Sequence, residues 1–231
     1  DSKEESIESE TFVVSKALIN ELTACLTEIV RSINISFGES QGESQILLMA
    51  AAALANITFR DTRPLVKHET LTALLNAAKI QDKFEEQRRL KLGDDDDDSN
   101  NHHGILLRDQ LITLLANVAQ KDPLDVVSSG GLIYLLDTLH RDSSTLGHDG
   151  VARARIQQKV AVALARLSQH KSTAKIIVRL NGVDRLVQWC QQPRERNYSD
   201  TVLLASIAAL KRLSQSIGRA PFEALGATDL I

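Results

Sequence analysis

Aromatic side chains are scarce in this sequence, where Phe, Tyr and Trp together make up 3% of 231 residues. A core with so few rings has to be built from aliphatic and small side chains, as helix-on-helix packing allows. The same scarcity disfavours nucleic acid as a partner, because base stacking needs aromatic side chains and no known nucleic-acid-binding module is present. No segment alternates apolar and polar residues in the manner of a β-strand. The sequence therefore predicts an all-α fold.

Cysteine is almost absent, since only Cys25 and Cys190 occur, and neither has a partner at metal-ligand spacing. Each lies in an apolar helical pattern, which predicts a small buried hydrophobic residue and a reducing, intracellular compartment. The longest uncharged apolar run, 46–59, is shorter than the roughly 20 residues that a bilayer requires. With no signal-peptide pattern at the start, these features predict a cytoplasmic protein without membrane insertion.

Catalytic motifs are also missing from the sequence. It contains no glycine-rich phosphate loop, no nucleophile elbow and no recognisable cysteine–histidine arrangement. His102 and His103 follow the acidic run 94–98, but a floppy loop does not preorganise metal ligands. We therefore expect no enzymatic activity, no cofactor and no metal site.

Charge is distributed unevenly along the chain. Residues 151–231 contain thirteen Lys or Arg and five Asp or Glu, a net charge of +8, so residues 1–150 carry −11 of the total of −3. This asymmetry predicts a basic surface in the second half that meets something acidic, either a partner or the chain's own acidic segments.

An internal repeat organises the apolar segments. Four stretches share a run of apolar and small residues followed by a polar residue, a β-branched residue or leucine, and a polar end: 46–59, 109–120, 155–169 and 201–215. When the four stretches are aligned, the polar position is occupied by Asn56, Asn117, Arg166 and Arg212, which are separated by 61, 49 and 46 residues. The first spacing includes the polar segment 93–104, expected to be a loop insertion, and without its twelve residues it becomes 49.

The segments between these stretches repeat as well. Each runs from a short apolar helix through Gly131, Gly182 or Gly226 into a second apolar helix, and 65–79 is a copy without glycine. We expect each glycine to end the short helix in a left-handed conformation, and a nearby proline to open that helix.

Units of three helices with a glycine joint resemble the armadillo repeat, whose period is about 40–47 residues. The predicted fold is a right-handed α-solenoid of about four armadillo units plus a truncated one that begins at 218. It occupies residues 16–231, with the acidic insertion 93–104, after an acidic, disordered lead-in at 1–15. Alanines 50, 51, 53 and 55 are expected to allow close helix packing.

The polar positions of the long third helices are the candidate partner-binding residues. In armadillo proteins that bind extended peptides, asparagines of the third helix face the concave groove and bond the peptide main chain; Asn56 and Asn117 match this pattern, whereas Arg166 and Arg212 replace asparagine. The tryptophan that importin-type grooves carry four residues earlier is also missing. Lys159 shares a helix face with Arg166, so Lys159, Arg166 and Arg212 form a candidate surface for an acidic segment. The alternatives are that the asparagines bond carbonyl groups between repeats and that the basic residues form a solvated helix face.

Four stretches resemble the C-terminal armadillo region of the Inscuteable family: ALANITFRDT (53–62), RDQLITLLANV (108–118), RIQQKVAVALARLS (155–168) and RERNYSDTVLLASIAALKRL (194–213). This resemblance implies a non-enzymatic scaffold of asymmetric cell division at the apical cell cortex. It would link the Bazooka polarity complex to the tetratricopeptide domain of Partner of Inscuteable and its Gα subunit, in a higher-order hetero-oligomer that orients the mitotic spindle. Two other functions stay open: a cargo or transport adaptor of the importin or catenin type, and a regulatory armadillo domain of a larger enzyme.

Overall fold

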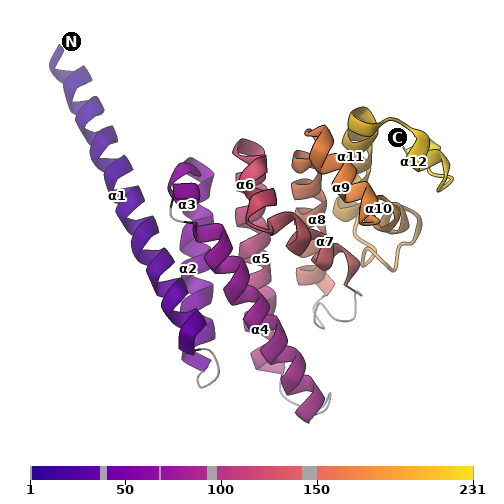
Figure 1. The fold of residues 1–231 in the computed structure, drawn as a ribbon, viewed down its shortest axis with the longest axis horizontal. Helices are drawn as coiled ribbons and strands as arrows, with labels where there is room; N and C mark the ends of the chain where they lie inside the picture. Colours follow the sequence, from indigo (N-terminus) through magenta and orange to yellow (C-terminus); the bar gives the residue numbers. More distant parts are fainter. Residues whose placement is uncertain (1, 37–40, 68, 93–97, 142–149, 231) are drawn as a thin grey trace.

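The computed structural model describes the backbone of residues 2–36, 41–67, 69–92, 98–141 and 150–230. Side chains are described for residues 16–33, 42–67, 69–83, 103–141 and 150–230. This part of the chain is helical and contains no strand, which confirms the predicted all-α class. Figure 1 shows the helices stacked in a row, in chain order from α1 to α12.

In the described part of the chain, three groups of three helices follow one another, preceded by α1 and α2 and followed by α12 and η2. The bounds are α1 Ser2–Ser36, α2 Gln41–Arg60, α3 Arg63–Lys67, α4 Thr70–Leu92, α5 Asp98–Lys121, α6 Pro123–Ser128, α7 Gly131–His140, α8 Gly150–Leu167, α9 Lys171–Arg179, α10 Gly182–Gln191, α11 Asp200–Ile217, α12 Ala220–Glu223 and the 3-10 helix η2 Thr228–Leu230. A short helix, a second helix and a long third helix therefore recur as α3–α4–α5, α6–α7–α8 and α9–α10–α11, as the sequence repeat predicted. In the first group, α4 with 23 residues is nearly as long as α5 with 24.

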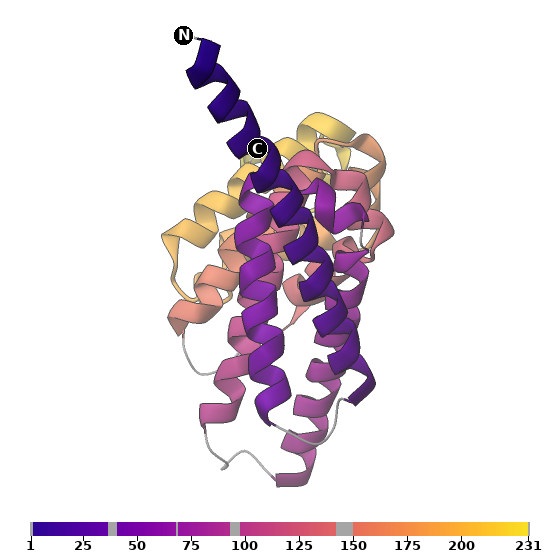
Figure 2. The same ribbon diagram turned by 90° about the vertical axis from the view of Figure 1, so that its left-hand side faces the viewer.

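Two layers of helices make up the stack. The long helices α2, α5, α8 and α11 pack each against the next, and α1, α4, α7 and α10 do the same in a second layer. Viewed from the N-terminal end, α1 and α2 lie in front of the other helices (Figure 2). This arrangement is an α-solenoid, in which each unit contacts its neighbours.

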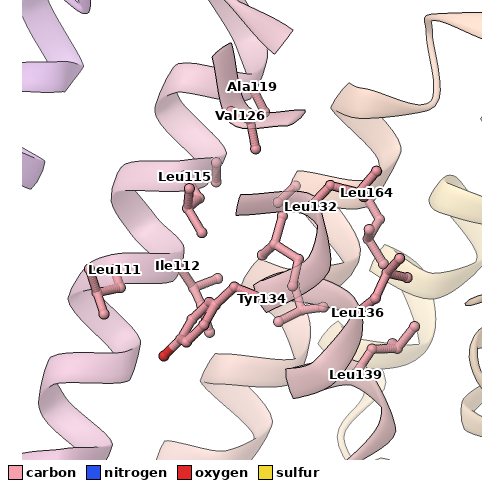
Figure 3. Packing of buried hydrophobic residues seen from close by; sticks show 14 of the residues in the cluster. Leu111, Ile112, Leu115, Ala119, Val126, Leu132, Tyr134, Leu136, Leu139 and Leu164 are labelled. Atoms are coloured by element: carbon pink, nitrogen blue, oxygen red, sulfur yellow. The ribbon is translucent and has the colours of Figure 1, made fainter. Parts of the chain in front are cut away.

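The core between the layers is aliphatic, as the shortage of aromatic residues required. Leu115 of α5, Val126 of α6, and Leu132, Leu136 and Leu139 of α7 meet in one cluster (Figure 3). All five are at most 3% exposed. The core runs through the described units as one continuous cluster of buried side chains.

Helix α2 contains the alanine-rich stretch. Ala50, Ala51 and Ala55 are at most 4% exposed, which agrees with their predicted role in close packing, whereas Ala53 is half-buried. The helix extends to 20 residues, beyond the uncharged run, so the expectation that it is too short to cross a bilayer is wrong on length. Since α2 packs against α1 and α5, its buried side chains such as Leu47 and Leu54 contribute to the core, whereas Ile46, Met49 and Phe59 are exposed.

The joints between the short and second helices differ from the prediction by one residue. The left-handed residues are Gly130 (φ 85°) and Asn181 (φ 57°), each directly before the expected glycine, and in the copy without glycine Glu69 (φ 53°) has this conformation. Gly131 and Gly182 are instead the first residues of α7 and α10. An added Cβ at Gly182 would lie 2.7 Å from Ile177 Cγ2, so close helix approach explains this glycine. Only Gly226 has the predicted left-handed backbone, with φ 61°.

Three further expectations are corrected or left open. Part of the predicted insertion 93–104 is helical, because α5 begins at Asp98. Asp, Ser and Asn residues favour a helix start at this point. Residues 93–97 lie outside the described part. Cys25 is exposed rather than buried, and Cys190 is half-buried where full burial was expected. The backbone of residues 2–15 continues α1, but their side chains lie outside the described part, and their role as an acidic lead-in stays a prediction.

Candidate interaction face on the third helices

The four aligned polar positions lie on the long helices α2, α5, α8 and α11. Asn117 Nδ2 of α5 donates to Ala55 O of α2 at 3.4 Å, and Arg166 Nη1 of α8 donates to Ala116 O of α5 at 2.6 Å. Each donor thus reaches the carbonyl group directly before the aligned position of the preceding unit. These bonds confirm the alignment, and for Asn117 they support the alternative that it bonds a carbonyl group between repeats.

We define the third-helix face as these aligned positions and the residues four before them. It comprises Asn56, Asn117, Arg166 and Arg212 together with Ala52, Thr113, Val162 and Ala208. All eight side chains are exposed or half-buried. The residues of the second row have smaller side chains than the aligned polar residues.

Lys159 is placed differently from the prediction. Its Nζ donates to Asp109 Oδ1 at 2.8 Å and to Thr113 Oγ1 at 2.7 Å, so it joins α8 to α5. Arg155 Nε lies 3.1 Å from the same carboxylate oxygen, and the Asp109 side chain is only 5% exposed. This carboxylate therefore holds two cations within the protein, and Lys159 is a structural residue in this arrangement. Sequence reasoning missed Asp109, which directly follows Arg108 in α5 and has no feature in the sequence that marks it as a buried acid.

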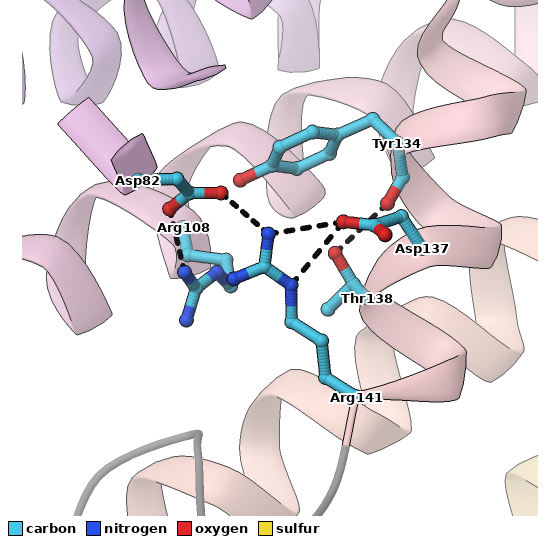
Figure 4. A network of polar contacts seen from close by, with 6 residues as sticks. All are labelled: Asp82, Arg108, Tyr134, Asp137, Thr138 and Arg141. Carbon is cyan, nitrogen blue, oxygen red and sulfur yellow. Dashed lines mark hydrogen bonds and ion pairs between the residues drawn. The ribbon is translucent and has the colours of Figure 1, made fainter. Parts of the chain in front are cut away.

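A second carboxylate between two cations lies among α4, α5 and α7 (Figure 4). Asp82 accepts from Arg108 Nη2 and from Arg141 Nη2, both at 2.7 Å, and Arg141 also bonds Asp137 at 2.9 Å. Tyr134 lies beside them, and complete burial raises its pKa to about 12. This network connects the two layers of helices, so we assign it a structural role.

Arg212 lacks such a carboxylate. It is exposed on α11, and within the described part of the chain no hydrogen bond or ion pair of its side chain is found. Burial, together with the nearby positive charge of Arg212, lowers the pKa of Arg166. Arg166 and Arg212 are therefore brought together by the fold, whereas Asn56 lies at the other end of the face, exposed and without a side-chain hydrogen bond to the described residues.

The loop between α10 and α11 belongs to the stretch that carried the family resemblance. Gln157 of α8 is 2% exposed; its Nε2 donates to Glu195 O at 2.6 Å and its Oε1 accepts from Asn197 Nδ2 at 2.8 Å. Asn197 and Tyr198 both have left-handed backbones, and Tyr198 is 68% exposed. Through these two hydrogen bonds, the buried Gln157 of the RIQQK stretch holds the RERNYSD loop against α8.

Metal-binding side chains do not gather in the described part of the chain, where no group of three His, Cys, Asp or Glu residues could hold an ion. The His102 side chain and residues 94–97 lie outside that part. What the described residues provide is an extended helical face with polar and cationic side chains, which suits the binding of a protein segment.

The described part of the chain is thus an α-solenoid with an extended helical face of polar and cationic side chains. The chain belongs to the Inscuteable family, since the family model described as "Protein inscuteable C-terminal" matches residues 6–227. It is 33% identical to the human "Protein inscuteable homolog" over 195 residues, which cover 82% of this chain and 30% of the human protein. The mouse "Protein inscuteable homolog" is 32% identical over the same shares. The chain thus spans less than a third of the length of these relatives.

No solved structure matches the chain. The family is therefore established by sequence comparison, and the helical architecture rests on the structure described above.

Proposed function

We propose that this chain is the armadillo-type interaction module of an Inscuteable adaptor, without enzymatic activity of its own. Membership of the family over residues 6–227 is the observation that carries this proposal. The units of a short, a second and a long third helix, joined at Gly131 and Gly182, agree with the armadillo pattern. An adaptor needs a rigid surface rather than a reactive centre, and the third-helix face is such a surface.

In the cell, the proposed adaptor links the Bazooka polarity complex to Partner of Inscuteable and its Gα subunit at the apical cortex, and so orients the mitotic spindle. Because the chain spans 30% of its human relative, other parts of the longer protein would share this task. The helical module would pack on the partner complex and complete a higher-order assembly.

Size-exclusion chromatography with light scattering tests this function. The chain, and a longer version that includes the family segment N-terminal to the armadillo region, are mixed with the tetratricopeptide domain of Partner of Inscuteable. We expect the longer version to form a stable complex whose mass is larger than the sum of one copy of each component. If even the longer version elutes separately from the tetratricopeptide domain, the proposed partner is wrong while the helical fold is unaffected.

The importin-type alternative loses support at Asn117. A peptide-binding ladder needs free asparagine amide groups, but the amide nitrogen of Asn117 donates to Ala55 O and to Thr58 Oγ1 at 3.1 Å. Only Asn56 keeps the exposure that such a ladder requires. We therefore favour the adaptor over a cargo carrier.

A further inference from the structure

Three pairs of cations among the described residues, all on the long helices or on helices beside them, differ in their surroundings. At two of them, a carboxylate lies between the positive charges: Asp82 bonds Arg108 and Arg141, and Asp109 bonds Arg155 and Lys159. The third pair is Arg166 and Arg212, and no carboxylate of the described residues bonds either of them. The first two pairs are neutralised in part by a carboxylate, whereas the pair of Arg166 and Arg212 has no such carboxylate among the described residues.

Proximity of Arg166 and Arg212 follows from the repeat. The two residues occupy aligned positions on α8 and α11, which pack directly against each other. Burial is the main cause of the lowered pKa of Arg166, and the positive charge of nearby Arg212 lowers it further. Two like charges held together by the fold are unfavourable alone, and an anion placed between them would relieve the repulsion.

Bonding capacity remains on both guanidinium groups. Arg166 uses Nη1 to bond Ala116 O, and this bond holds its side chain in place. A guanidinium group has five N–H donors and binds carboxylates in a two-pronged geometry. Arg212 is exposed and keeps its donors for a ligand. Both arginines therefore have N–H donors available to a carboxylate, Arg166 from a fixed position and Arg212 from an exposed one.

The surroundings favour an extended segment over a compact one. Val162 and Ala208 lie one turn before the arginines and are small, while Gln169 and Gln215 lie one turn after them and are exposed. Small residues admit a peptide main chain, and glutamine amides can bond its N–H and C=O groups. Residues 151–231 also carry a net charge of +8, so an acidic ligand is attracted over a longer range.

We propose that Arg166 and Arg212 recognise an acidic, extended segment of a partner protein, with a carboxylate of that segment between the two guanidinium groups. This inference rests on the proposed adaptor function and specifies the chemistry of one of its binding surfaces. The segment crosses α8 and α11 on the third-helix face, and its main chain runs over Val162 and Ala208. Neighbouring helices are about 8–10 Å apart, so three to four extended residues span the site.

Fluorescence anisotropy with a synthetic probe tests the site. The probe is a fluorescein-labelled twelve-residue peptide of alternating Glu and Ser, and its control has Gln in place of each Glu. We expect the Glu peptide to bind in 50 mM NaCl, to weaken in 300 mM NaCl, and the Gln peptide not to bind. Arg212→Glu should weaken binding about tenfold or more, and Arg212→Lys severalfold, since lysine lacks the planar fork.

Lys175→Glu is the matched control, because Lys175 is exposed on α9 and the change in net charge is the same. We expect it to alter the affinity by less than about twofold, and both variants should keep the parent melting temperature. Equal weakening by Arg212→Glu and Lys175→Glu would show that only overall charge attracts the peptide, and the inference would be wrong. Absence of binding by the Glu peptide would also overturn it.

The same variants separate this inference from the proposed function. If Arg212→Glu loses the peptide but the assembly with the tetratricopeptide domain forms normally, the site is supported and serves another partner. If the assembly forms and the Glu peptide never binds, the inference is wrong while the adaptor function stands.

Discussion

At the scale of single residues, the glycines at the helix joints show how closely the units are packed. Gly131 and Gly182 open α7 and α10 at points where neighbouring side chains occupy the position of a Cβ atom. The nearest atoms are Leu115 Cδ2 at 2.6 Å from an added Cβ at Gly131, and Ile177 Cγ2 at 2.7 Å from one at Gly182. Glycine is therefore required at both positions because there is no space for a Cβ atom, and not because the backbone is left-handed.

Replacing Gly182 with alanine should therefore destabilise the protein. The added methyl group would meet Ile177 and also Leu136 Cδ2 at 3.0 Å, and overpacking of this kind costs about 1–3 kcal/mol. Urea denaturation measures the change in the free energy of unfolding. Gly150→Ala is the control, because its nearest side-chain atom is 3.8 Å away, and it should be neutral or stabilising by up to about 1 kcal/mol. Equal free energies for both variants would contradict the proposed crowding.

The two cysteines should differ in reactivity. Burial raises the pKa of the Cys190 thiol to about 11, so at pH 8 its thiolate fraction is about a hundredfold lower than for an unperturbed thiol. Cys25 is exposed. We expect a thiol reagent such as DTNB to react at pH 8 in a fast and a slow phase, and Cys25→Ser to remove the fast phase. A fast phase that persists in Cys25→Ser would show that Cys190 is accessible.

At the scale of helices, side-chain bonds to carbonyl groups fix how each long helix lies against the previous one. Besides Asn117 and Arg166, Lys121 Nζ donates to Arg60 O at 3.0 Å and Ser216 Oγ donates to Ser168 O at 2.5 Å. The accepting groups, Arg60 O and Ser168 O, lie at the carboxyl ends of α2 and α8, where helix carbonyl groups carry partial negative charge. The repeat in sequence thus reappears as a repeat of contacts between helices.

Asn117 and Asn56 form a matched pair for testing these contacts. Asn117→Ala removes donors to Ala55 O and Thr58 Oγ1 between α5 and α2, and should lower the free energy of unfolding by about 1 kcal/mol. Asn56→Ala removes no side-chain bond to the described residues and should change it by less than about 0.5 kcal/mol. Chemical denaturation of the two variants is the measurement. The assignment of Asn117 as an inter-repeat residue fails if both variants are equally stable.

At the scale of the whole molecule, stability should vary along the stack. Each unit of a solenoid is supported by its neighbours, so inner helices have two supporting sides and end helices one. Hydrogen exchange should therefore be slowest in α5 and α8 and fastest in α12 and η2. Phe222→Ala, a fully buried change in α12, should speed exchange in the last unit alone, whereas Leu115→Ala in α5 should speed it in several units. Uniform protection along the chain would contradict this description.

Much of the architecture could be predicted because the repeat itself carries the information. Alignment of Asn56, Asn117, Arg166 and Arg212 identified four equivalent helices, and each lies where the spacing placed it. The candidate site was less predictable. Lys159 shares a helix face with Arg166, yet a buried carboxylate on the neighbouring helix engages it, and periodicity within one helix contains no information on that neighbour.

The sequence by itself determined the helical class, the division into units and the family, because these depend on periodic apolar residues and on local stretches such as RIQQK. Only the tertiary structure decided which polar residues are used inside the stack. Asn117 and Lys159 bond across helix interfaces, while Asn56 and Arg212 are left exposed. The physical reason is that a side chain's partners come from helices about 50 residues away in the chain, and their distances are set by packing.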